Sequence, residues 1–137
     1  MPEVLTVPDP SAEPSAVVPS VLVVDDDDAL RRTIAEYARS RGMAVWEAAN
    51  GLEALWVTKH QRPALVLVDL RMPRLDGYET IRHIRKFDPA IRVAVITGDV
   101  SDATRQRVAD LGLDLLTKPF ELHALDELLG GGLRPPS

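Results

Sequence analysis

Five short apolar segments alternate along the chain with stretches in which apolar residues recur at helical spacing. Three of these segments are rich in β-branched residues and apolar at consecutive positions, which is typical of parallel strands covered on both faces. The other two are shorter and are weaker strand candidates. The predicted strands cover residues 21–24, 45–46, 64–68, 93–96 and 115–116.

Five amphipathic helices are expected between and after the strands. Gly42 is a stop signal for the first helix, and Asn50 with Glu53 three residues later resembles a capping box at the start of the second. The apolar positions of the five helices are Leu30, Ile34, Tyr37 and Ala38; Leu52, Leu55 and Trp56; Ile81 and Ile84; Val100, Thr104, Val108 and Leu111; and Leu122, Leu125 and Leu129.

The strict alternation of strands and helices predicts an α/β fold. Right-handed crossover connections then favour a doubly wound parallel sheet. Ligands of such folds bind beyond the carboxyl ends of the strands, where the strand order reverses. The residues directly after each strand are therefore the candidate functional residues.

Both ends of the chain differ in composition from the middle. Residues 1–19 hold five of the eleven prolines and three acidic residues but no basic one, so we expect a disordered leader. Residues 130–137 include three consecutive glycines and two consecutive prolines and are expected to form a flexible tail. A single domain over residues 20–129 remains.

Composition excludes several classes of protein. The net charge is −5 and no cluster of Lys or Arg is present, so we expect no direct binding to nucleic acid. The absence of cysteine excludes disulfides and thiolate chemistry. No apolar run approaches the roughly 18 residues of a membrane span, and the N-terminus does not resemble a secretion signal. We therefore expect a soluble, cytoplasmic protein without membrane contact.

The residues that follow the predicted strands have ionisable or hydrogen-bonding side chains. Four consecutive aspartates, residues 25–28, come after the first strand, and Asp69 follows the third. Several carboxylates at one sheet edge repel one another unless a cation lies between them, and oxygen ligands suit Mg²⁺. Thr97 after the fourth strand and Lys118 after the fifth are donors for a tetrahedral anion such as a phosphoryl group. The sequence thus predicts a joint site for a metal ion and a phosphate.

Four motifs lie in order at the ends of the expected strands. They are VLVVDDD at 21–27, DLRMPRLDGYE at 69–79, ITG at 96–98 and LTKPF at 116–120. Together they resemble the receiver domain of two-component response regulators, and the resemblance extends over essentially all of residues 20–129. It implies the flavodoxin-like fold, with five parallel strands in the order 2-1-3-4-5 and five helices.

By this resemblance, Asp69 is the phosphoacceptor of a phosphorelay. Its phosphoryl group would come from a phosphohistidine on a sensor histidine kinase or a histidine phosphotransfer protein. Asp25, Asp26, the Asp69 carboxylate and the backbone carbonyl of Arg71 would hold Mg²⁺. A carboxylate is already ionised at neutral pH, so Asp69 needs no general base to attack phosphorus.

The resemblance also gives roles to residues around the phosphoryl group. Lys118 would neutralise charge on the transferring group, and Thr97 would donate a hydrogen bond to it once attached. A cis bond before Pro119 would aim Lys118 inward. Gly77 suits a sharp loop exit ahead of the third helix. The protein would be a switch of protein contacts, with slow self-dephosphorylation as its only turnover.

Two other functions are open to this sequence. Residues 25–27 also satisfy the Asp-x-Asp signature of haloacid-dehalogenase-like phosphohydrolases, although the chain is short for such an enzyme and Asp69 would stay unexplained. A degenerate receiver that acts only as a binding module is the second alternative, although every chemistry-bearing position is filled. The sequence also leaves open whether the chain is a complete protein or a receiver excised from a hybrid histidine kinase.

Several other residues receive a structural interpretation. Asp28 is read as the N-cap of the first helix. The histidines make no metal site or triad and are expected to be exposed on helices, whereas the large aromatic residues are expected to pack in the core. These residues are His60, His83 and His123, and Trp46, Trp56, Tyr37 and Tyr78, respectively.

Two hypotheses concern the switch itself. Arg71 and Asp99 lie two residues beyond Asp69 and Thr97, and an ion pair between them would hinder an attacking water. Receivers commonly carry an aromatic residue where this chain has Leu115, so we expect weaker coupling of activation to the last helix. That helix, residues 121–129, contains no Arg or Lys for charged dimer contacts, and we expect a monomer.

Overall fold

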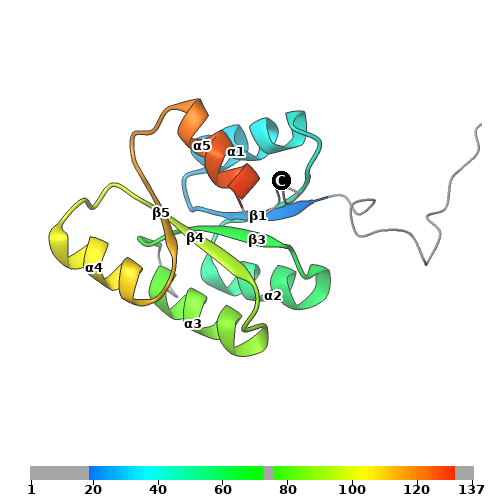
Figure 1. Ribbon diagram of the computed structural model, residues 1–137. Coiled ribbons are helices and arrows are strands. Elements are labelled where there is room, and N and C mark those ends of the chain that lie inside the picture. Colours follow the sequence, from blue (N-terminus) through cyan, green and yellow to red (C-terminus); the bar gives the residue numbers. More distant parts are fainter. Residues whose placement is uncertain (1–18, 73–75, 132–137) are drawn as a thin grey trace, which may run out of the picture.

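The computed structural model describes residues 19–72 and 76–131 (Figure 1). Its strands are β1 (Ser20–Val24), β2 (Ala44–Ala48), β3 (Leu65–Asp69), β4 (Arg92–Thr97) and β5 (Asp114–Thr117). All neighbouring strands are parallel, and their order is β2-β1-β3-β4-β5, so the predicted topology is confirmed. The two weak strand candidates are both real strands, at the two edges of the sheet.

The helices are α1 (Asp28–Ser40), α2 (Gly51–Gln61), α3 (Gly77–Phe87), α4 (Asp102–Asp110) and α5 (Leu122–Gly131). α1 and α5 lie on one face of the sheet, and α2, α3 and α4 lie on the other (Figure 1). Because the central strands are apolar at consecutive positions, each face has its own core. Ile34 and Leu125 belong to one core, and Ile84 and Val108 belong to the other. Among the described helices, none has the length and apolar character needed to cross a bilayer.

The helix starts correct one prediction and confirm another. Asp27, not Asp28, is the N-cap of α1: its backbone is extended, and its carboxylate accepts a hydrogen bond from Leu30 N at 3.1 Å. Asp28 is the first helical residue instead. At α2 the capping box is confirmed, since the Asn50 side chain accepts from Glu53 N and the Glu53 carboxylate accepts from Ala49 N.

The expected core position of Trp56 is wrong. Its side chain is 60% exposed, like that of Leu52 at 56%, and its ring stacks on His60 with centroids 4.1 Å apart. The buried positions of α2 are the small residues Gly51, Ala54 and Thr58, and Leu55 packs against the core while partly exposed, so only one of the three predicted apolar positions faces the sheet. The other three aromatic residues pack against the cores, and all three histidines are exposed, as expected.

Two of the apolar positions predicted for the fourth helix are exposed. Val100 precedes α4 and is 53% exposed, and Leu111 follows this helix at 43%, so neither is a core residue. Gly42, with φ +85°, follows α1 in the conformation expected of a stop signal. Most of the predicted leader, most of the predicted tail and Pro73 lie outside the described residues.

Gly77 lets the first turn of α3 approach the end of β3. A Cβ atom at this position would lie 2.6 Å from both the Asp69 carbonyl oxygen and Leu70 Cα. The Gly77 N–H donates to the Leu70 carbonyl at 3.1 Å. The glycine is therefore required by close backbone contact beside Asp69.

Replacing Gly77 by alanine should destabilise the protein, because neither backbone atom that the new methyl group meets can move without shifting β3. The expected loss is about 1–3 kcal/mol of the free energy of unfolding, the usual cost of overpacking. Urea denaturation in EDTA measures it. Gly98→Ala is the matched control, since a Cβ there meets nothing within 4 Å. Equal stability of the two variants would contradict the close-contact explanation.

Candidate functional site

Three carboxylates meet at the carboxyl end of the sheet. Asp25 and Asp26 follow β1, and Asp69 ends β3, the neighbouring strand. Each offers an oxygen atom, and these atoms lie within 4.8 Å of one another. Asp25 and Asp69 are buried, at 1% and 6% exposure, whereas Asp26 is exposed. The predicted convergence of these three residues is confirmed.

Lys118, which directly follows β5, also contacts this cluster. Its Nζ lies 3.4 Å from Asp25 Oδ2 and 3.5 Å from Asp69 Oδ2. The backbone N–H of Lys118 donates to the Thr97 carbonyl at 2.8 Å, which fixes the residue beside β4. The peptide bond before Pro119 is cis, as the resemblance implied. One ammonium group thus contacts both buried carboxylates.

The charge of the cluster is not balanced by Lys118 alone. Burial raises the pKa of Asp25, and the nearby negative charge of Asp69 raises it as well, although the Asp27 N–H and Lys118 act in the opposite direction. Two acidic groups this close in a buried setting favour a bound cation. An all-oxygen donor set suits a hard divalent ion such as Mg²⁺.

The Thr97 hydroxyl group lies at the end of β4 and is buried, at 1% exposure. Its oxygen accepts a hydrogen bond from the Asp99 N–H at 3.0 Å. This bond uses a lone pair of the oxygen, so the hydroxyl proton is available as a donor. Thr97 therefore keeps a hydrogen-bond donor at the end of β4, the strand next to β3 and Asp69.

Asp99 has a role that the sequence did not indicate. Its carboxylate accepts from the Thr104 hydroxyl at 2.6 Å and from Ser101 N at 2.9 Å, at the start of α4. These hydrogen bonds, led by that of Thr104 and helped least by the charge of Arg71, lower the pKa of Asp99 to about 2. In the part of the chain that the structure describes, Arg71 and Asp99 form no ion pair, so their pairing stays a hypothesis.

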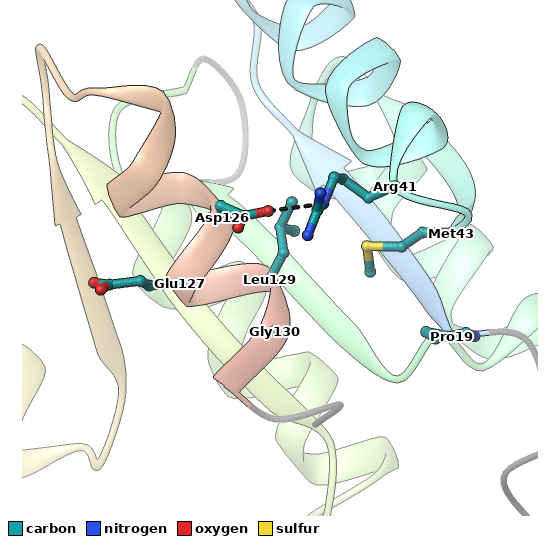
Figure 2. Close-up of a pocket in the computed structure, with 7 residues that line it drawn as sticks. All are labelled: Pro19, Arg41, Met43, Asp126, Glu127, Leu129 and Gly130. Carbon is teal, nitrogen blue, oxygen red and sulfur yellow. Dashed lines mark ion pairs between the residues drawn. The ribbon is translucent and has the colours of Figure 1, made fainter. Parts of the chain in front are cut away.

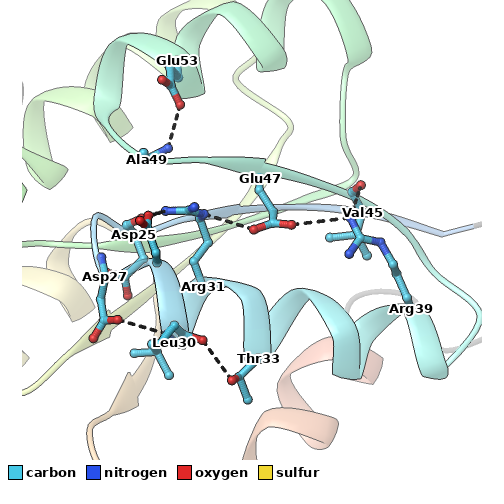
Figure 3. A network of polar contacts seen from close by, with 12 residues as sticks. Asp25, Asp27, Leu30, Arg31, Thr33, Arg39, Val45, Glu47, Ala49 and Glu53 are labelled. Atoms are coloured by element: carbon cyan, nitrogen blue, oxygen red, sulfur yellow. Dashed lines mark hydrogen bonds and ion pairs between the residues drawn. The ribbon is translucent and has the colours of Figure 1, made fainter.

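Arg31 and Glu47 were also missed. The Arg31 guanidinium donates to the backbone carbonyl of Asp25 and to the Glu47 carboxylate, as Figure 3 shows. A weak signal exists in the sequence, because Glu47 is a lone charged residue within the apolar β2.

The pocket drawn in Figure 2 does not belong to this site. It measures about 340 Å³ and is lined by residues such as Pro19, Met43 and Leu129. Pro19 directly precedes β1, so the pocket lies at the amino end of the strands, opposite the carboxylates. Two of its charged residues pair with each other, since Arg41 Nε lies 2.9 Å from Asp126 Oδ1.

A model of the response regulator receiver domain matches residues 21–129. The chain belongs to this family. The receiver domain is 35% identical over 106 residues to sporulation initiation phosphotransferase F of Bacillus subtilis, covering 77% of this chain and 86% of that protein. It is 40% identical over 112 residues to the response regulator MprA of Mycobacterium sp. (strain KMS), covering 80% of this chain and 46% of that protein.

The chain spans about half the length of several curated relatives that it matches. A solved structure of the Saccharomyces cerevisiae phosphotransfer protein Ypd1 with the receiver domain of Ssk1 also aligns. The TM-score is 0.76 at 26% identity, over 82% of this chain and 87% of the solved chain. Family and fold agree with the site described above.

Replacing Asp99 by Asn should destabilise the receiver domain at neutral pH, because the anion accepts the hydrogen bonds that start α4. A lowered pKa contributes stability above the unfolded value of 3.8, and this contribution is lost as the pH falls through about 2. The difference in melting temperature from wild type should therefore narrow between about pH 5 and about pH 2. Asp102→Asn in the same turn sets the baseline. A pH-independent difference would contradict this role.

Proposed function

We propose that the receiver domain accepts a phosphoryl group on Asp69 from a phosphohistidine, in a Mg²⁺-dependent reaction. The observation that carries this proposal is the placement of the Asp69 carboxylate, between two further carboxylates and the Lys118 ammonium 3.5 Å away. A sensor histidine kinase or a histidine phosphotransfer protein would be the donor. The phosphorylated form would change the protein contacts of the domain.

Each side chain has a task in this reaction. The Asp69 carboxylate attacks phosphorus in line, and the bond from phosphorus to the histidine nitrogen breaks. Lys118 lies against the nucleophile and offsets the charge of the incoming group. The Thr97 hydroxyl then donates to an oxygen of the aspartyl phosphate. All three residues act from the ends of different strands, so the sheet holds them in place before the donor arrives.

The donor set fits Mg²⁺. The carboxylates of Asp25, Asp26 and Asp69 with the backbone carbonyl of Arg71 would hold the ion. When bound, Mg²⁺ supplies positive charge that stabilises the phosphoryl oxygens during transfer. Burial of Asp25 beside Asp69 supports this, because the lysine leaves part of the negative charge unbalanced.

The surface beside Lys118 supports a protein donor. A pocket of about 480 Å³ lies between α1 and the start of α5 and includes Lys118 itself. Its lining is mostly apolar, with Leu30, Phe120 and the exposed Leu122 among the residues. A protein that presents a phosphohistidine to Asp69 would cover this pocket. The solved Ypd1–Ssk1 complex is a precedent for such a pair in the family.

The alternatives explain less. A phosphohydrolase of the haloacid-dehalogenase type is not favoured by the family, and it leaves Asp69 without a task. A purely binding receiver does not need Asp69, Thr97 and Lys118 all in place. Slow self-dephosphorylation is the turnover we propose, with the domain monomeric, cytoplasmic and without direct contact to nucleic acid or membrane.

Phosphorylation of the full chain by acetyl phosphate tests the proposal. With MgCl₂, the wild-type chain should gain the mass of one phosphoryl group as an acid-stable, base-labile acyl phosphate, because Asp69 provides the nucleophile. Asp69→Asn should gain none, and EDTA should abolish the gain in wild type. Asp99→Asn, which changes another aspartate near the site, should still be modified. Equal modification of wild type and Asp69→Asn in intact-mass spectra would reject the assignment.

A further inference from the structure

Arg31 joins three elements around the turn that carries Asp25 and Asp26. Its Nη1 donates to the backbone carbonyl of Asp25 at 2.9 Å, and its Nε donates to Glu47 Oε1 at 3.1 Å (Figure 3). The same Nη1 lies 2.7 Å from Asp28 Oδ1. One guanidinium therefore links the end of β1, the first turn of α1 and the edge strand β2.

The surroundings of Arg31 hold it in one orientation. Its side chain is only 11% exposed, and that of Glu47 is 26% exposed. A guanidinium is a planar fork whose donors point in fixed directions, so bonds to β1 and β2 together define where it lies. A lysine at this position has one charged nitrogen on a flexible stem and lacks the fixed geometry of the two nitrogens that make these bonds.

We infer that Arg31 is a positioning residue for the cation site. By holding the Asp25 carbonyl it sets the path of the backbone from which the Asp25 and Asp26 side chains project. This inference rests on the Mg²⁺ site of the proposed function. Orientation matters for Mg²⁺ because the ion demands nearly octahedral geometry. Residues that orient metal ligands typically change metal affinity about 10–100-fold when they are removed.

The charge of Arg31 would act in the opposite direction from its hydrogen bonds. A guanidinium near the site repels Mg²⁺, so loss of the charge alone would tighten Mg²⁺ binding. Loss of the hydrogen bonds loosens the turn and weakens binding. The sign of the change therefore separates a positioning role from a simple effect of charge.

Titration calorimetry of the full chain with MgCl₂ measures the dissociation constant. Arg31→Gln and Arg31→Lys should each weaken Mg²⁺ binding about tenfold, although only the first removes the charge. Arg32→Gln is the matched control, because Arg32 is the next residue and is exposed, and its side chain forms no hydrogen bond or ion pair with the described residues. This control should bind Mg²⁺ as tightly as wild type or slightly more tightly. Thermal melts in EDTA check that each variant is folded.

Three results would overturn the inference. Unchanged or tighter Mg²⁺ binding by folded Arg31→Gln and Arg31→Lys would contradict a positioning role while leaving the proposed function intact. Asp25→Asn lacks one of the proposed Mg²⁺ ligands and should bind Mg²⁺ poorly. A wild-type chain that binds Mg²⁺ no better than this variant would contradict the proposed function and this inference with it. If the folded Arg31→Lys variant alone retains wild-type binding, the two fixed nitrogens of the guanidinium are not needed to position the turn, and the inference is wrong.

Discussion

The site depends on keeping several negative charges together at one edge of a largely apolar sheet. Asp25 and Asp69 are buried side by side and share the Lys118 ammonium at 3.4 and 3.5 Å. Like charges in such a place are costly, as the raised pKa of Asp25 shows. The fold can hold them because strong backbone pairing and two apolar cores surround the site. The same unbalanced charge supports the proposal that this edge binds a divalent cation and, with it, a phosphoryl group.

Strand register brings these residues together. Val24 lies opposite Val68 in the β1–β3 pair, so Asp25 and Asp69 follow at the same level. Thr97 lies opposite Thr117 in the β4–β5 pair. Lys118 follows Thr117 and therefore lies one residue beyond the level of Thr97. Because all the strands are parallel, each contributes its next residue to the same edge. The same parallel arrangement therefore buries the apolar strands and brings the polar residues that follow them together.

Much of this arrangement follows from the sequence. Strand ends can be located from apolar runs, and in a parallel sheet they converge, which identified Asp25, Asp69, Thr97 and Lys118. The cap at Asp27 could not be separated from Asp28, because neighbouring aspartates cap equally well until the backbone is known. Trp56 was misplaced because α2 packs closely through small residues, so size did not indicate burial.

The network around Arg31 was hidden for another reason. Hydrogen bonds from Arg31 to the Asp25 carbonyl and to Glu47 depend on how α1 lies over β2. We propose that Lys118 and a divalent cation balance the same carboxylates, and the melting temperatures of wild type and Lys118→Gln, measured in EDTA and in Mg²⁺, test this proposal. In EDTA the variant should melt well below wild type, and saturating Mg²⁺ should reduce the difference between their melting temperatures. A difference that stays constant or grows with Mg²⁺ would contradict a shared role of Lys118 and the cation at these carboxylates.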